Sequence, residues 1–137
     1  MTAALPYILQ TWFAGRGWTP HVHQLEMLTA ATQGESALLI APTGGGKTLA
    51  GFLPSLTDLI ATEPPADGLH TLYISPLKAL AVDIHRNLEL PIAEMELAIR
   101  AETRTGDTPQ SKRVRQRKKP PHMLMTTPES LALLLSY

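Results

Sequence analysis

The sequence predicts an α/β fold in which a mostly parallel sheet is flanked by helices. Short apolar runs alternate along the chain with segments of helical periodicity, as in strands joined by crossover helices. A glycine-rich turn separates the first apolar run from the helical segment that follows it. With 137 residues, 44% of them hydrophobic and 18% charged, the chain fits one globular domain. No apolar run reaches the roughly 18 residues that a membrane span needs.

Three elements are predicted in the first half of the chain. Residues 22–33 have the spacing of a helix that ends at Gly34, with an apolar face made of Val22, Leu25, Met27 or Leu28, and Ala31. Residues 37–40 are a continuous apolar run, typical of a buried strand. A second helix is predicted from about Gly46 to Ala61. Pro54 inside it lacks a backbone donor and should kink it.

The second half repeats the alternation after a loop at residues 62–68. Strands are predicted at 71–74, 99–105 and 123–126, and helices at 77 to about 88, 109–118 and 128–136. Pro109 suits the first turn of its helix because its ring fixes a helical φ angle. The chain stops at Tyr137, directly after the last helix and without a closing tail, so we expect it to be cut from a longer protein.

Composition also bears on the compartment. The segment MTAALPYILQTWF lacks the basic start and long apolar run of a signal peptide. The chain has no cysteine, which excludes disulfides and thiolate metal sites and fits a reducing cytosol.

The loop Ala41-Pro42-Thr43-Gly44-Gly45-Gly46-Lys47-Thr48 predicts a site for the phosphates of a nucleoside triphosphate. Its glycines let successive backbone N–H groups face one anion, and the following helix aims its positive end at the same point. Lys47 would neutralise the β- and γ-phosphates, and the Thr48 hydroxyl would ligate Mg²⁺. The remaining cradle comprises Thr43, Gly44, Gly45 and Gly46. Ala41 stands where the general pattern has glycine.

The sequence contains residues for binding a nucleotide but not the acidic pair for hydrolysing it. Hydrolysis needs an acidic residue that holds Mg²⁺ and a base that orients water, and these usually follow another apolar strand as Asp-Glu. No such pair occurs in the 137 residues. No carboxylate or histidine cluster accompanies the loop either, so Mg²⁺ should arrive with the nucleotide. We therefore expect a chain that binds the nucleotide better than it cleaves it.

A second motif precedes the loop. Gly17-Trp18-Thr19-Pro20 followed by Gln24, 23 residues before Lys47, resembles the Q motif of superfamily 2 helicases. The resemblance implies that the Gln24 amide reads the adenine edge, since an amide donates and accepts at once, and that the nucleotide is ATP. By itself, Gln24 could equally be a surface residue at the start of a helix. Family members also stack an aromatic ring on adenine, and the candidates here are Tyr7, Trp12 and Trp18.

Three further segments follow predicted strands. Ser75-Pro76-Leu77-Lys78 resembles motif Ia, Thr105-Gly106-Asp107-Thr108 a GDT element, and Thr126-Thr127-Pro128-Glu129-Ser130 motif Ib. In these helicases such segments grip the sugar-phosphate backbone, which agrees with hydroxyls and N–H groups placed where a strand ends and a helix begins. The resemblance implies nucleic-acid contacts for Lys78, Thr105, Thr108, Thr127 and Ser130. Each segment alone could be a simple helix cap.

Four longer runs carry a closer resemblance: ALLIAPTGGGKTLAGFLPSL, LYISPLKALAVDI, ETRTGDTP and WFAGRGWTPHVHQLEML. The first three resemble the large helicase-related (Lhr) family, and the fourth resembles its bacterial ligase-associated DEXH-box subgroup. The resemblance implies a partial RecA-like P-loop domain, cut before motif II, with Lys47 and Thr48 as its catalytic residues. For the whole protein it implies ATP-driven 3′-to-5′ translocation on single-stranded DNA, or on a DNA/RNA hybrid. A DNA-repair role beside a DNA ligase in the bacterial cytoplasm is also implied.

The charge is divided unevenly. Residues 1–99 carry four Lys/Arg and nine Asp/Glu, and residues 100–137 carry eight and three, although the formal net charge is zero. Six of the basic residues fall within positions 112–119: Lys112, Arg113, Arg115, Arg117, Lys118 and Lys119. This basic run could attract a polyanion, or it could be the solvated face of a helix.

Two other functions and one stability consequence also follow from the sequence. The phosphate loop could belong to a kinase or GTPase, although the guanine-reading Asn-Lys-x-Asp is absent, and the chain could be a nucleic-acid-binding module without catalysis. If the motif II strand is missing, the strand at 38–40 would have an unpaired apolar edge, which promotes aggregation.

Overall fold

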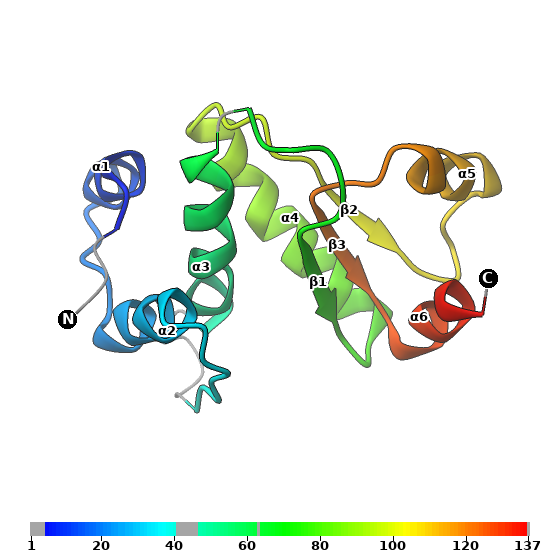
Figure 1. Cartoon of the computed structure of the whole chain (residues 1–137), viewed down its shortest axis with the longest axis horizontal. Helices are drawn as coiled ribbons and strands as arrows, with labels where there is room; N and C mark the ends of the chain where they lie inside the picture. The colour runs from blue at the N-terminus through cyan, green and yellow to red at the C-terminus, as the bar shows by residue number, and fades with distance from the viewer. Residues whose placement is uncertain (1–4, 41–46, 63, 137) are drawn as a thin grey trace. The chain divides into compact units, whose positions relative to one another are not determined.

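The computed structural model describes residues 5–40, 47–62 and 64–136. The chain divides into two compact units, Met1–Glu63 and Pro64–Tyr137. The first unit contains helices and the second contains a sheet with helices (Figure 1).

The first unit contains α1 (Tyr7–Gly15), α2 (Val22–Thr32) and α3 (Lys47–Ala61). The sequence pattern did not predict α1, which is short and buries only Leu9 and Phe13. It ends at Gly15, and the chain then turns at Gly17, whose φ of 71° is left-handed. The Trp18 N–H donates to the Phe13 carbonyl at 2.9 Å across this turn. The core of this unit includes Leu9 of α1, Leu28 of α2, and Leu53 and Leu56 of α3, which are all buried.

Helix α2 matches the predicted boundaries and part of the predicted face, since Leu28 is buried as expected. It ends before Gly34, which has a φ of 73° as a left-handed stop. Val22 is 71% exposed, and Gln24 and Leu28, four residues apart, are the buried positions. The prediction counted only apolar residues. A glutamine can occupy a buried position when its amide is hydrogen-bonded. The buried face of α2, which contacts α3, therefore passes through Gln24 and Leu28 and not through Val22.

The predicted strand at residues 37–40 is wrong. Residues 35–40 have no regular structure, and Leu38 and Ile40 are each 86% exposed. A strand forms by pairing its N–H and C=O groups with a neighbour, and no strand in the described part of the chain pairs with this segment. The helix predicted after the loop is confirmed as α3, with Pro54 inside it.

The second unit is built on a parallel sheet of three short strands. They are β1 (Thr71–Ile74), β2 (Ala101–Arg104) and β3 (Met123–Thr126), in the order β1-β3-β2. The three predicted strands are therefore confirmed, with β2 shorter than expected. All four residues of the central strand β3 are buried. The predicted α/β class with a mostly parallel sheet is correct.

Helices α4 (Lys78–Glu94), α5 (Gln110–Lys118) and α6 (Pro128–Leu135) complete this unit. Helix α4 packs on β2 and β3 and continues six residues beyond the predicted end at Leu88. Pro91 lies in its last turn, where its ring is buried and its carbonyl accepts the Met95 N–H at 2.9 Å. Among the described residues, no helix is long and apolar enough to cross a membrane.

Candidate functional site

The phosphate loop is described only at its end. The predicted cradle residues Thr43, Gly44, Gly45 and Gly46 lie outside the described residues, whereas Lys47 and Thr48 open α3. Both are exposed, and the first turn of this 15-residue helix has no acidic residue to compete for its N–H groups. The Lys47 ammonium and the Thr48 hydroxyl thus stand at the positive end of a helix, where an anion is stabilised.

Gln24 is not the surface residue that its position allowed. It is 2% exposed, and its Oε1 accepts the His21 N–H at 2.8 Å, which closes the first turn of α2. The bond fixes the orientation of the amide group. A carboxamide oxygen has two lone pairs, so Oε1 can accept a second donor beside the His21 N–H.

The three candidate aromatic rings differ in their surroundings. Trp12 and Trp18 meet edge to face with centroids 5.6 Å apart, and the Arg16 guanidinium lies 5.1 Å and 5.4 Å from their respective ring centroids. Tyr7 is 82% exposed and Trp18 is 50% exposed. The two tryptophans therefore already have a cation and a ring against them, whereas Tyr7 extends into solvent.

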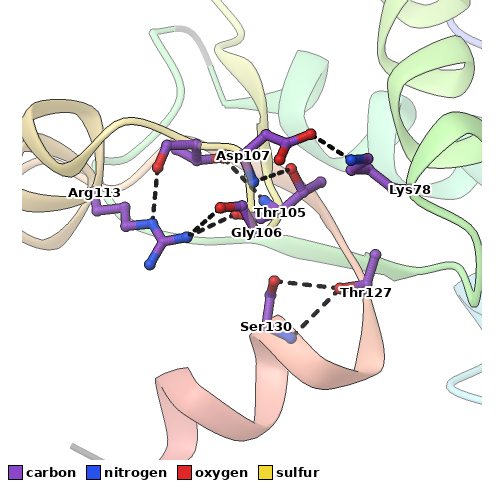
Figure 2. Close-up of polar contacts among 8 residues, drawn as sticks. Lys78, Thr105, Gly106, Asp107, Arg113, Thr127 and Ser130 are labelled. Carbon is purple, nitrogen blue, oxygen red and sulfur yellow. Dashed lines mark hydrogen bonds and ion pairs between the residues drawn. The ribbon is translucent and has the colours of Figure 1, made fainter.

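The segments that follow the three strands meet at one edge of the sheet. Ile74 and Arg104 are both in register with Thr126, so the residues after them (Ser75, Thr105 and Thr127) lie at the same carboxyl edge. An ion pair between Lys78 and Asp107 links the segment after β1 to the segment after β2 (Figure 2). The predicted gathering of polar groups at this edge is thus present in the second unit.

The turn Thr105–Thr108, which follows β2, is held by its own hydroxyls (Figure 2). The Thr105 N–H donates to Thr108 Oγ1 at 2.9 Å, and the Asp107 N–H donates to Thr105 Oγ1 at 3.3 Å. The Thr108 N–H donates to the Thr105 carbonyl at 3.2 Å, as in a β-turn. The two threonine side chains thus shape the backbone of the turn, with Thr105 only 5% exposed.

Thr127 and Ser130 cap α6. The Ser130 N–H donates to Thr127 Oγ1 at 3.4 Å, and the two hydroxyl oxygens are 3.2 Å apart. Both residues are buried, at 6% and 7% exposure. The sequence left open whether these two residues cap a helix or contact a nucleic-acid strand, and in the structure they cap α6. A ligand at this point would meet the N-terminus of α6 more than the two side chains.

The basic run is partly structural. Arg115 donates to Glu102 Oε1 at 2.8 Å, and Gln116 Nε2 donates to the same oxygen at 3.1 Å. Burial raises the pKa of Glu102, but these two hydrogen bonds and the charge of Arg115 outweigh it and leave the pKa lowered. Arg113 binds the carbonyls of the turn after β2. Sequence reasoning missed these bonds, because a charge run does not reveal which of its members face inward.

A shallow pocket lies beside the Lys78–Asp107 pair. It has a volume of about 400 Å³ and is lined by residues of α4, of β2 and the turn after it, and of α5, including Lys78, Thr105, Thr108 and Lys112. Lys78 and Lys112 can attract phosphate oxygens there, and the Asp83 and Asp107 carboxylates, which also line the pocket, offset their charge. Within the described ranges, no group of three His, Cys, Asp or Glu residues could hold a metal ion.

Comparisons with known proteins identify the family. The DEAD/DEAH box helicase family model matches residues 21–136. ATP-dependent helicase Lhr-Core protein 2 of Thermococcus barophilus is 40% identical over 93% of the chain and 16% of the relative. The Lhr helicase/uracil glycosylase of Escherichia coli is 41% identical over 91% of the chain and 9% of the relative. The chain therefore spans less than a fifth of each of these relatives.

Solved helicase structures are similar to this chain in fold. Mycobacterium smegmatis helicase Lhr bound to ssDNA and AMP-PNP superposes with a TM-score of 0.86 and 39% identity, over 97% of this chain and 18% of that one. The yeast DEAD-box splicing factor Prp28, at 20% identity and a TM-score of 0.82, shares the fold. The chain belongs to the DEAD/DEAH box helicase family and is similar to Lhr-type helicases over more than nine-tenths of its length.

Proposed function

We propose that this chain is the first part of an ATP-dependent Lhr-type helicase motor, comprising most of its first RecA-like domain ahead of motif II. It binds ATP with Mg²⁺ in its N-terminal unit and single-stranded DNA at the carboxyl edge of its sheet. The observation that carries the proposal is the convergence of three strand-end segments at that edge. The relative from M. smegmatis, which was solved with ssDNA and AMP-PNP, supports both ligands.

The nucleotide site combines four contributions. Gln24 reads the adenine edge with an amide that the His21 N–H already orients. The residues from Thr43 through Gly46 cradle the phosphates with their backbone N–H groups. Lys47 neutralises the β- and γ-phosphates at the start of α3, and Thr48 ligates the Mg²⁺ that the nucleotide brings.

The DNA site is a backbone site rather than a base-reading one. Lys78 offers an ammonium that is half-exposed, so it can exchange or share its bond to Asp107 with a phosphate oxygen. Thr105 and Thr108 shape the turn after β2, and Thr127 and Ser130 shape the N-terminus of α6. The turn and the helix N-terminus both present backbone N–H groups to a ligand. Contacts of this kind position a strand without reading its sequence.

Binding alone is the expected activity of these 137 residues, because they contain no Asp-Glu pair after a strand. Translocation, unwinding and a repair role beside a DNA ligase are proposals for the whole protein, of which this chain spans a small share. So are the ligase-associated subgroup, a DNA/RNA hybrid as substrate and a bacterial cytoplasmic location, which all rest on the sequence resemblance.

The proposal is tested by fluorescence anisotropy with a labelled oligothymidylate. We expect the wild-type chain to bind, and Lys78→Gln to weaken binding and to lower the salt slope by up to about 0.7, the value for one phosphate contact on a single strand. Lys118→Gln is the matched control, because Lys118 is an exposed lysine on α5 with no polar contact to the described residues. Absence of binding, or equal losses in the two variants, would argue against the proposed edge.

A further inference from the structure

Arg113, one arginine of the basic run, binds the turn after β2. The Arg113 guanidinium donates through Nε to the Thr108 carbonyl at 3.0 Å, and through Nη2 to the carbonyls of Thr105 and Gly106 at 3.0 and 3.2 Å. Figure 2 shows the side chain entering from α5 and reaching all three oxygens. Three carbonyls of a four-residue turn are thus directed at one cation, and its planar fork fixes their directions.

The same bonds decide where the N–H groups of the turn point. In a trans peptide, the carbonyl of one residue and the N–H of the next are antiparallel. Since the Thr105 carbonyl faces Arg113, the Gly106 N–H points away from it. The N–H groups of Thr105, Asp107 and Thr108 are used inside the turn. Within the described residues, the Gly106 N–H alone in this turn has no acceptor, and Gly106 is exposed.

The fold does not require glycine at this position. The φ angle of Gly106 is not in the left-handed region, and a Cβ built on it would meet no atom within 4 Å. What glycine provides is an unobstructed approach to its own N–H group. The Asp107 carboxylate nearby is paired with Lys78, which reduces its repulsion of an approaching anion.

We propose that Arg113 is a positioning residue, which holds the turn Thr105–Thr108 so that the Gly106 N–H is presented to a phosphate of the bound single strand. The inference rests on the proposed DNA-binding function and deepens it. Arg113 contributes through the geometry of the turn and not through its charge alone, so a lysine cannot replace it. A lysine keeps the positive charge but lacks the fork that binds several carbonyls at once.

The test uses the whole chain with a labelled oligothymidylate and compares Arg113→Lys and Arg113→Gln with Arg86→Lys and Arg86→Gln. Arg86 is exposed on α4 and has no polar contact with the described residues. Both Arg113 variants should bind the oligonucleotide about tenfold more weakly or worse, because the hydrogen bond between the Gly106 N–H and a charged phosphate is lost. Both Arg86 variants should stay within about twofold, since an exposed charge outside the site contributes little.

Two readouts separate positioning from a structural role. In ¹H–¹⁵N spectra the Gly106 amide should shift when DNA is added to the wild type and should respond far less in Arg113→Lys. Gly106→Ala keeps the N–H and should fold normally, since its Cβ meets no atom, but it should weaken binding by crowding the phosphate. This variant does not disturb Arg113, so it tests the site even if Arg113→Gln unfolds.

The outcomes are distinct. If the wild type does not bind the oligonucleotide, the proposed function fails. If the wild type binds while its Gly106 amide does not respond, or if Arg113→Lys binds as the wild type does, the role of Arg113 is refuted and the proposed function stands. If Arg113→Gln and Arg86→Gln lose the same affinity, Arg113 contributes no more than an exposed arginine outside the site, which also overturns the inference.

Discussion

The buried His122 should make the second unit sensitive to acid. This residue is 2% exposed, and its Nδ1 accepts the backbone N–H of Arg100 at 2.9 Å. That bond exists only when Nδ1 carries no proton, so the folded state holds the neutral ring. Burial, the charge of Arg100 and the nearby His70 all lower the pKa of His122, and Asp67 opposes them only in part.

The direction of the pH effect follows from this lowered pKa. The unfolded chain takes up the proton near the ordinary histidine pKa of about 6.5, above the folded value. The contribution of His122 to stability is therefore fully present above about pH 6.5 and is lost as the pH falls through the folded pKa. One proton changes the free energy of unfolding by at most about 1.4 kcal/mol per pH unit, so the loss between pH 6.5 and 5 is at most about 2 kcal/mol.

The perturbation is His122→Phe, measured by urea denaturation followed by circular dichroism at about pH 7.5 and pH 5. At the higher pH the variant should lose about 1–3 kcal/mol in the free energy of unfolding, because the Arg100 N–H loses its acceptor. At the lower pH the difference between the free energies of unfolding of the variant and the wild type should be smaller. The reasoning is refuted if the difference is the same at both pH values, since the ring would then not be held neutral.

Three other predictions follow from single contacts. Gln24→Ala should weaken ATP binding more than GTP binding in a competition assay, and equal losses would contradict adenine recognition. Glu102→Gln should lower the free energy of unfolding at neutral pH by at most about 1 kcal/mol, because Arg115 loses its charged partner but is half-exposed to solvent. The difference from the wild type should disappear as the pH falls through the lowered pKa of Glu102. A difference in urea or thermal unfolding that persists at low pH would contradict the ionised pair. Replacing Leu38 and Ile40 by serine should reduce aggregation in light scattering without lowering Tm, because both are 86% exposed; a lower Tm would show that they are packed.

The fold of the second unit was predictable because its elements depend on local patterns. Residues 71–74 and 123–126 are compact apolar runs between breakers, and both are strands. The Thr127-Pro128 start of α6 also follows from capping chemistry. Residues 37–40 have the same pattern without becoming a strand. An apolar run predicts a strand only if a neighbour is present, and neighbours are not encoded locally.

The candidate site was predictable in its residue types and less so in their roles. The positions of Lys47, Thr48 and Lys78 were read directly from motifs, and each lies in the first turn of a helix. In the structure Thr105 and Thr127 are buried and shape the backbone, and the expected contact of their side chains with nucleic acid stays a prediction. Arg113 could not be told apart from the other charges near it, because only the folded turn brings three carbonyls to its guanidinium.

The central claim is that this chain binds ATP through Lys47 at the start of α3. Its most direct test is isothermal titration of ATP with Mg²⁺ into the wild-type chain and into Lys47→Ala, with Lys118→Ala as the charge-matched control. We expect Lys47→Ala to bind ATP about tenfold more weakly or worse, because a charge-assisted bond to phosphate is removed. Lys118→Ala should bind ATP as the wild type does. Unchanged affinity in Lys47→Ala would contradict the claim.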